Sequence, residues 1–187
     1  MILNSHQCVA HHKKIHDLEN RFFGEDFKCK YDDVKHWLTS DSFFCSTLTD
    51  NSIVLHCVQE VCTMLMTTED SATKLINNEI KEYELSPFWT NSKSERCVLY
   101  YSSLISINPN HARSLLRSVA ADIEMFKVKY NIIPCWSLSI PTGKEAFDHL
   151  KHGGFRTINQ HRYLQKYQLM RLDKNEINGR FWTKLLN

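Results

Sequence analysis

The sequence predicts an α/β (α+β) fold, in which a mixed, mostly antiparallel central sheet carries helices on both faces. Residues 97–107 and 132–140 have the pattern of strands on either side of a helix over 111–130, which makes a β-α-β unit. Residues 43–48 and 53–66, rich in β-branched and sulfur-containing residues, are separated by a turn at 49–52 and predict an antiparallel hairpin. We expect a single domain over residues 1–187, of which about 173–187 form a C-terminal extension.

Two helices are predicted at the start of the chain. Residues 10–23 place Ile15, Leu18 and Phe22 on one face and end at Gly24. Residues 31–40 repeat the pattern with Val34, Trp37 and Leu38. His12 and His16 have the i,i+4 spacing of a metal pair, but spacing places no third ligand. We therefore expect no metal site.

The strand over 53–66 has two largely apolar faces, as a central strand has. His56 and Glu60 lie two side chains apart on one of them, as an acid/base pair or as a polar pair at a sheet edge. A short helix over 71–80 and a long loop through residue 95 follow, and in an enzyme such a loop covers the substrate. Phe88 and Trp89 either anchor this loop or form a pocket wall, and the anchor is the favoured interpretation.

The helix over 111–130 has a continuous apolar stripe, which contains Leu115, Leu116, Val119, Ile123 and Phe126. Pro134 lacks an N–H near the start of the next strand, so a gap beside the preceding strand is expected there. Thr142 and Glu145 have capping-box spacing for a helix that ends at Gly153-Gly154.

The chain is predicted to end in a hairpin and a short terminal helix. The hairpin pairs residues 155–158 with 163–172 around a turn at 159–162. Residues 173–187 contain the apolar side chains that pack the terminal helix back on the body, namely Phe181, Trp182, Leu185 and Leu186.

Composition excludes several classes of function. The 23 basic and 21 acidic residues give a net charge of +2, so neither a nucleic acid nor an anionic membrane is expected as a partner. We find no pattern of a signal peptide and no apolar run of the roughly 20 residues that span a bilayer. The seven cysteines are scattered without a C-x-x-C pair, as reduced core residues are, and a cytoplasmic protein is expected.

This order of elements resembles the GCN5-related N-acetyltransferases over roughly residues 10–172. The strongest local match is Pro-Thr-Gly-Lys-Glu-Ala-Phe-Asp-His-Leu-Lys-His-Gly-Gly-Phe at 141–155, which is similar to the segment where that family ends its fifth strand and enters a Gly-Phe pair. The resemblance implies an acyl-CoA N-acyltransferase-like fold, acetyl-CoA as acyl donor, and a small-molecule or peptide amine as acceptor. In the family the fourth and fifth strands splay apart around the pantetheine arm.

The resemblance also implies where the cofactor binds. The turn at 108–114 precedes a helix N-terminus, where free N–H groups and the helix dipole favour a pyrophosphate. The family carries glycines in this turn and this chain carries none. The expected cofactor-binding residues are Ile105, Ser106, Ile107, Asn110, His111, Ala112, Arg113, Ser114, Leu115, Ser137 and Thr142, with backbone N–H groups near Ser106 and Ile107 as the oxyanion hole.

The expected catalytic residues are Glu60, His149 and Ser139. Glu60, with His56 or an ordered water as alternatives, is the expected base. Many family members have, at the position of Leu150, a tyrosine that protonates the departing CoA thiolate. In this chain His149 or His152 is the expected general acid. Ser139 and Ser137 are expected to bind the pantetheine or to orient a water.

The function expected from these residues is direct transfer of an acetyl group from acetyl-CoA to an amine, by a monomer or a homodimer. The missing glycines and tyrosine favour an alternative, a degenerate relative that binds an acyl-CoA or a protein partner without turnover. A third possibility is an α/β binding module unrelated to the family, because a fold does not establish a function.

Overall fold

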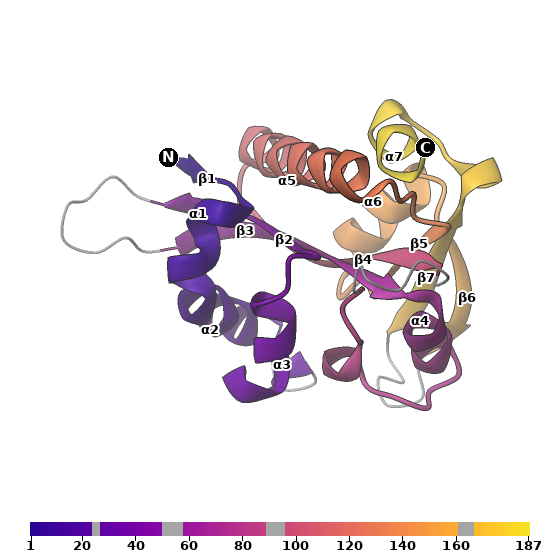
Figure 1. The fold of residues 1–187 in the computed structure, drawn as a ribbon, viewed down its shortest axis with the longest axis horizontal. Coiled ribbons are helices and arrows are strands. Elements are labelled where there is room, and N and C mark those ends of the chain that lie inside the picture. Colours follow the sequence, from indigo (N-terminus) through magenta and orange to yellow (C-terminus); the bar gives the residue numbers. More distant parts are fainter. Residues whose placement is uncertain (24–26, 50–57, 89–95, 161–166) are drawn as a thin grey trace.

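The computed structural model describes residues 1–23, 27–49, 58–88, 96–160 and 167–187, which form a seven-stranded sheet in the order β1-β2-β3-β4-β5-β7-β6 (Figure 1). The strands are β1 (Ile2–Leu3), β2 (Phe43–Thr49), β3 (Val58–Thr68), β4 (Cys97–Ile105), β5 (Trp136–Ser139), β6 (Arg156–Gln160) and β7 (Gln168–Asp173). The α-helices are α1 (Ser5–Cys8), α2 (His12–Phe22), α3 (Tyr31–Leu38), α4 (Glu69–Ile76), α5 (Pro109–Tyr130), α6 (Lys144–His152) and α7 (Arg180–Leu186). The 3₁₀ turns are η1 (Val9–His11), η3 (Glu82–Glu84) and η4 (Lys174–Glu176).

Helices cover both faces of this sheet, which confirms the predicted fold class. In Figure 1, α2 and α3 lie on one face, and α5 and α7 lie on the opposite face. Neighbouring strands pair antiparallel except β4 and β5, which are parallel and are joined through α5. The central β-α-β unit is therefore present as predicted, and it contributes the one parallel pair among the described strands.

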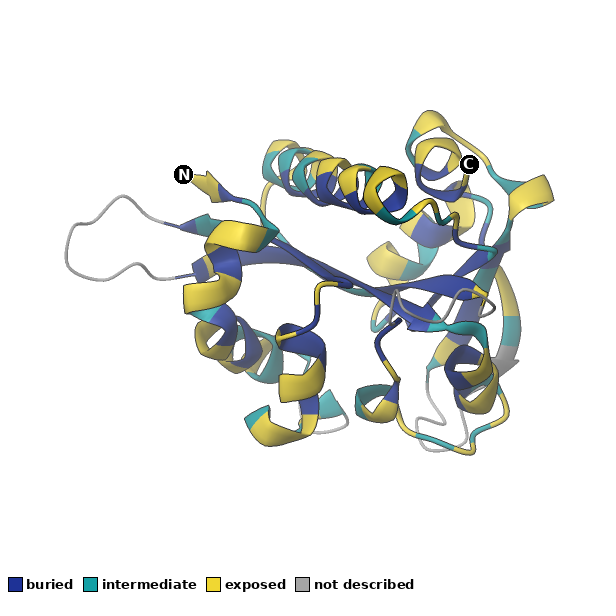
Figure 2. Ribbon diagram, viewed as in Figure 1, coloured by how far each residue is buried: buried dark blue, intermediate teal, exposed yellow. Residues whose placement is uncertain are grey.

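The sheet separates two apolar cores. Side chains on the α2 and α3 face, among them Ile15, Trp37 and Tyr100, form one cluster. Side chains on the α5 and α7 face, among them Leu115, Ile123 and Trp182, form the other. Figure 2 shows the consequence, because buried residues run along the central strands and on the helix faces turned toward them. Alternation along each strand supplies both cores from the same backbone.

Helix α5 begins two residues before the predicted start. Asn108 is its N-cap, and Pro109 occupies the first helical position, where the missing N–H costs nothing. The helix ends at Tyr130, because Asn131 is left-handed with φ 52° and ψ 50°.

Strand β5 is much shorter than the predicted 132–140. The N–H of Ile132 still bonds to the Lys127 carbonyl of α5 at 3.1 Å, and Pro134 has no N–H to donate, so regular pairing starts only at Trp136. The predicted capping box is also wrong. Gly143 is the N-cap of α6 and no side chain caps it.

The remaining boundaries shift by a few residues. Helix α4 starts at Glu69 because the Thr68 hydroxyl caps it, accepting from Ser71 N at 3.1 Å. Strand β6 runs through Gln160, into the predicted turn. Phe88 is 3% exposed in the α5-side core, as an anchor is, and Trp182, Leu185 and Leu186 are buried as predicted. His56, Trp89 and the rest of the predicted 159–162 turn lie outside the described residues.

Two short elements at the start of the chain were not predicted. Ile2 and Leu3 form β1, which pairs with β2. Ser5, the first residue of α1, donates its backbone N–H to the Asp122 carboxylate of α5 at 2.8 Å. Among the described residues, no helix combines the length and the hydropathy that crossing a membrane requires.

We predict that Gly154→Ala destabilises the fold through a backbone clash. Gly154 has φ +99°, and an added Cβ would stand 2.1 Å from the Glu176 carbonyl oxygen. Gly179 is the matched control, since it has φ +101° and open space around its Cα. We expect Gly154→Ala to lower the free energy of unfolding by at least about 2 kcal/mol, and Gly179→Ala by about 1 kcal/mol, in urea denaturation. Equal losses would show that φ alone matters at both positions.

Candidate active site

A β-bulge interrupts β4 at Ser102. Thr63 of β3 pairs with Ser103 while Met64 pairs with Tyr101, so Ser102 has no partner in β3. A bulge bends a strand and increases its twist locally. It also shifts the alternation of side chains. In an uninterrupted strand, Ser103 and Ile105 would share the face of Tyr101, whereas here they face α2 and α3.

Pairing between β4 and β5 ends at the same place. The register runs from Leu99–Ser137 to Tyr101–Ser139 and stops, leaving the second half of β4 without a β5 partner. The gap therefore lies at the end of the strand pair that is far from Pro134. At the Pro134 end the strands remain connected, because the Cys135 N–H donates to the Cys97 carbonyl at 2.8 Å. Because a bulge bends a strand, we attribute the gap to the bulge at Ser102 and not to Pro134.

The two serines of β5 form hydrogen bonds to the half of β4 that pairs with β5. Ser137 Oγ donates to the Leu99 carbonyl at 2.8 Å, and Ser139 Oγ donates to the Tyr101 carbonyl at 2.9 Å. Both side chains are at most 5% exposed. Each hydroxyl proton is thus already used within the sheet.

A cavity of about 680 Å³ adjoins the bulge on the α2 and α3 face of the sheet. Ser102, Ile140 and Thr142 line it from the sheet side, so the predicted residue Thr142 is part of this wall. Aromatic side chains line much of the remainder, namely Phe23, Phe27, Trp37, Phe43 and Tyr83. The volume is that of a site for a small molecule.

Glu19 projects from α2 into the wall of this cavity. Its Oε1 accepts hydrogen bonds from the Ser103 hydroxyl and, at 3.1 Å, from the Thr63 hydroxyl. Burial raises the pKa of Glu19 despite these two donors. Glu19 follows Ile15 by four residues, and a carboxylate on the apolar stripe of a helix is the signal by which the sequence could have revealed it.

Glu82 of η3 is the second carboxylate of the cavity. Burial raises its pKa to about 7, the hydrogen bond from the Tyr100 hydroxyl opposes this rise, and the negative charge of Glu19 adds to it. Tyr100 is 1% exposed on β4, two residues before the bulge. Nothing in the sequence around Glu82 distinguishes it, because its position depends on how residues 77–88 return to the sheet.

Acidic side chains act on a thiol in the wall of the cavity. Cys29 lies in its wall, and burial together with the charges of Glu82, Glu19 and Asp33 raises the pKa of this thiol to about 11. The cysteine is therefore held as a thiol near neutral pH. His16 Nε2 lies 3.8 Å from Cys29 Sγ and 3.2 Å from the Asn20 amide nitrogen.

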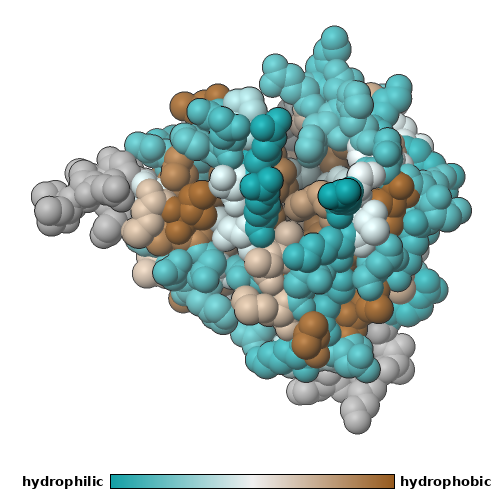
Figure 3. All heavy atoms as spheres, turned by 90° about the horizontal axis from the view of Figure 1, so that it is seen from above, coloured by the Kyte–Doolittle hydropathy of each residue, from teal (hydrophilic) through white to brown (hydrophobic). Residues whose placement is uncertain are grey.

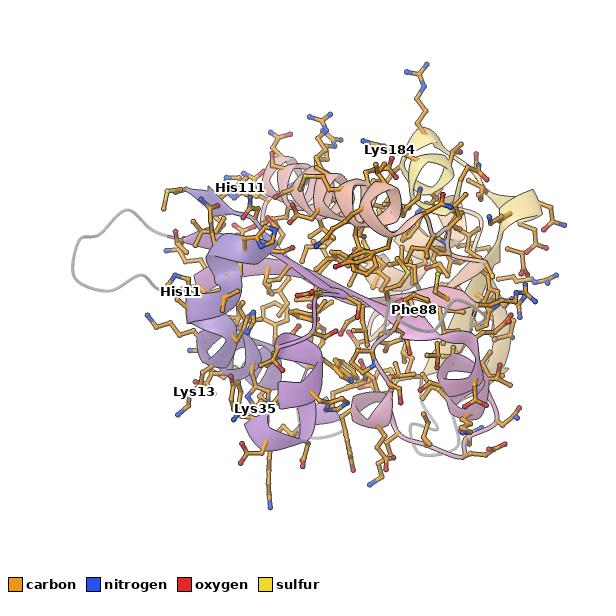
Figure 4. All side chains as sticks on the ribbon, in the orientation of Figure 1. His11, Lys13, Lys35, Phe88, His111 and Lys184 are labelled. Atoms are coloured by element: carbon orange, nitrogen blue, oxygen red, sulfur yellow. The ribbon has the colours of Figure 1, made fainter. Side chains whose placement is uncertain are left out.

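The N-terminus of α5 lies on the opposite side of the sheet, where Figure 4 labels His111. The Asn108 side chain accepts from Asn110 N at 2.8 Å, and the Ala112 N–H bonds the Asn108 carbonyl at 2.9 Å. The chain thus satisfies part of this helix end with its own side chain. Arg113 is exposed there and donates to the Asn110 side chain at 3.3 Å, and the Ser114 hydroxyl donates to the Asn110 carbonyl at 3.0 Å.

Glu60 lies beneath this turn. Its carboxylate is buried and accepts from the Ser106 hydroxyl, while His111 Nδ1 is 2.8 Å from Glu60 Oε1. The side chain of His111 is 44% exposed, so one edge of the ring faces solvent. A buried carboxylate needs partners of this kind, because an uncompensated charge costs several kcal/mol.

The predicted residues therefore separate into two groups. Glu60, Ser106 and Asn110–Ser114 gather at the start of α5, with Ile107 88% exposed beside them and Ile105 and Leu115 buried in the two cores. Ser137, Ser139 and Thr142 lie where β4 and β5 separate. Since a strand rises about 3.3 Å per residue, Ser106 lies about 13 Å along the chain from the bulge.

His149 is on α6, apart from both groups of contacts. Burial, and then the neighbouring His152, lower its pKa. The buried stripe of α6 carries Leu150 as predicted. Across the described residues, no group of three His, Cys, Asp or Glu side chains is placed to hold a metal ion.

Similar architectures occur among solved structures. A structure of Arabidopsis thaliana NAA60 in complex with acetyl-CoA matches with a TM-score of 0.54 at 10% identity, covering 89% of this chain and 94% of that one. FeeM, an N-acyl amino acid synthase from uncultured soil microbes, matches with a TM-score of 0.54 at 8% identity, covering 92% and 94%. The NatC complex bound to Gag peptide and CoA matches with a TM-score of 0.51 at 13% identity, covering 86% and 87%.

The chain has the GCN5-related N-acetyltransferase fold. No family model matches the sequence, and the comparison with curated proteins found no match. The identities of 8–13% explain this, since the fold is retained while most side chains differ. Within the GCN5-related fold, the bulged β4 and the shortened β5 define the gap, and the cavity opens beside it.

We predict that Glu82→Gln changes how stability depends on pH. Between pH 4.5 and about 7 the folded chain keeps a proton on Glu82 that the unfolded chain loses, so the free energy of unfolding falls as the pH rises through this range. Glu82→Gln lacks this loss, and its stability relative to the native chain should increase by up to about 3 kcal/mol from pH 4.5 to 8.

Urea denaturation at intervals of one pH unit measures the difference. Glu145→Gln, which removes an exposed carboxylate at the start of α6, controls for the loss of one negative charge. A constant difference between native and Glu82→Gln over this range would contradict the prediction.

Proposed function

We propose that this protein transfers an acyl group from an acyl-CoA to an amine. The observation that carries the proposal is the separation of β4 from β5 at the Ser102 bulge, directly beside a ligand-sized cavity. The fold supports the same activity, because similar structures are described as an acetyl-CoA complex, a CoA complex and an N-acyl amino acid synthase. We take acetyl-CoA as the donor.

The phosphates of the donor lie, in this proposal, at the start of α5. Helix N–H groups and the positive end of the helix dipole favour an anion there, and Arg113 and His111 add side chains that can bind phosphate oxygens. Glu60 then orients His111 from below. These side chains take the place of the close backbone approach that glycines would allow.

The acyl group lies at the bulge, where the gap meets the cavity. The amine nitrogen attacks the thioester carbonyl from the cavity side, the new C–N bond forms, and the C–S bond breaks to release CoA. Holding the two reactants in line is itself a large contribution to the rate of such a bimolecular step. Direct transfer needs no nucleophile from the protein, which agrees with the raised pKa of Cys29.

A second function, binding an acyl-CoA without turnover, is favoured by one observation. The Asn108 side chain already occupies the N–H of Asn110, which leaves fewer donors for a pyrophosphate. Calorimetry with acetyl-CoA and thiol release on a panel of amines separate the possibilities. We expect a micromolar dissociation constant, about −8 kcal/mol, and amine-dependent release of thiol. Binding without release supports the second function, and absence of binding contradicts both.

We predict that Arg113→Ala weakens acetyl-CoA binding about fivefold to tenfold, or about 1.0–1.4 kcal/mol, through the loss of one phosphate contact. Arg180→Ala at the start of α7 is the control, because it removes the same charge from an exposed helix start elsewhere. The affinity of the native chain should also fall with added salt, and Arg113→Ala should flatten this dependence. Equal affinities for the two variants would place the phosphates elsewhere.

A further inference from the structure

Two carboxylates in the cavity beside the bulge, Glu19 and Glu82, have neutral hydrogen-bond donors and no lysine or arginine partner among the described residues. Glu19 Oε1 accepts hydrogen bonds from two hydroxyl groups, and Glu82 interacts with the hydroxyl of Tyr100. Within the described part of the chain, neither carboxylate forms an ion pair with a lysine or an arginine. Burial raises the pKa of both groups and so disfavours their charged forms. A bound cation would reverse that penalty.

The apolar part of the cavity sets the shape of such a cation. Phe23, Phe27 and Phe43 line it together with the ring of Tyr83, and Phe27 also contacts Tyr167 of the segment before β7, with ring centroids 4.8 Å apart. Aromatic walls bind an apolar body and stabilise an ammonium group near their faces. The volume of about 680 Å³ accommodates a small amine.

The charges around the cavity disfavour an acceptor that carries an anionic group next to its amine. Glu19 and Glu82, both less exposed than the lysines, line the cavity, and their charges, together with burial and the exposed Asp33, raise the pKa of Cys29. The lysines that line the cavity, Lys28, Lys30 and Lys81, are solvent-exposed and therefore lie at its mouth. A carboxylate on the carbon that carries the amine would be held against the acidic side chains and away from the lysines.

We propose that the acceptor is a primary amine with an apolar, aromatic-sized body and no carboxylate beside the amine, and that Glu82 takes the proton that its ammonium group loses. This inference rests on the proposed acyl transfer. The ammonium gives one proton to the Glu82 carboxylate and becomes an amine, which attacks the thioester carbon. When the C–S bond breaks, the departing CoA thiolate takes the second nitrogen-bound proton, and Glu82 releases the first to solvent.

Glu82 suits this role in position as well as in acidity. It is hydrogen-bonded to Tyr100, which stands two residues before the bulge where the acyl group is placed. A base with a pKa of about 7 is half ionised at neutral pH and is regenerated readily after each turnover. Glu19, held by Thr63 and Ser103, is the second negative group of the ammonium site and a positioning residue.

Matched pairs of amines test the substrate class. Phenethylamine and L-phenylalanine share one aromatic body and differ by the carboxylate, and L-phenylalaninamide restores a neutral group at that position. We expect kcat/KM for phenethylamine to exceed that for L-phenylalanine by at least about tenfold, with the amide close to phenethylamine. Equal or better use of L-phenylalanine overturns the proposed class of acceptor.

Variants test the role of Glu82. Glu82→Gln should lower kcat by about 10²–10⁴-fold without weakening acetyl-CoA binding, and should remove the rise of kcat/KM through about pH 7 that we expect of the native enzyme. Glu19→Gln should mainly raise KM for the amine. Glu145→Gln is the control for charge. A kcat of Glu82→Gln within about threefold of native would overturn the assignment, and loss of the fold is checked by its urea denaturation curve.

Calorimetry with phenethylamine alone distinguishes this inference from the proposed function. Binding that weakens in both Glu19→Gln and Glu82→Gln supports the ammonium site even where no thiol is released. Thiol release on L-phenylalanine but not on phenethylamine supports acyl transfer while rejecting the inferred acceptor. No binding of phenethylamine, with or without acetyl-CoA, rejects it as well.

Discussion

The unpaired residue Ser102 in β4 is the constraint on which the candidate site depends. Ser102 has no partner in β3, the pairing of β4 with β5 ends after Tyr101, and the second half of β4 has no β5 partner. Such an edge inside a sheet is unfavourable in a purely structural protein, since buried N–H and C=O groups need partners. A ligand with amide groups can supply them, and the pantetheine arm of CoA is a ligand of this kind.

The same bulge decides which side chains meet. By shifting the alternation it turns Ser103 toward α2, where its hydroxyl reaches Glu19, and it leaves Ser102 in the wall of the cavity. The two faces of the sheet consequently differ in chemistry. The face of α2, α3 and η3 has a cavity lined by the partly buried acids Glu19 and Glu82, while the face of α5 has the Glu60–His111 pair and an exposed arginine at the helix start. Figure 3, which views the molecule from the side of α5 and α7, shows a largely hydrophilic surface with separate apolar patches.

The raised pKa of Glu82 in the cavity affects both the stability of the fold and the ability of this carboxylate to accept a proton. Glu82 lies where desolvation raises its pKa to about 7, which costs stability at neutral pH and places the carboxylate in the acidity range of a useful base. Structural carboxylates in this chain are satisfied differently. Asp122 accepts from the N–H and the hydroxyl of Ser5, and Glu60 has both Ser106 and His111. Glu19 and Glu82 also interact with hydroxyl groups of the fold, but they line the cavity, and burial raises the pKa of both.

The sequence by itself determined the element types and the central β-α-β unit, since helical and strand periodicity are local properties that α5 and β4 display clearly. It also proposed candidate site residues such as Glu60, His111, Ser139 and Thr142, whose places in the chain follow from the order of elements. Only the tertiary structure decided that Glu60 meets His111 and that Glu19 and Glu82, 63 residues apart, share one cavity. Such meetings depend on strand register, on one bulged residue and on the path of a loop, and periodicity carries no information about any of these.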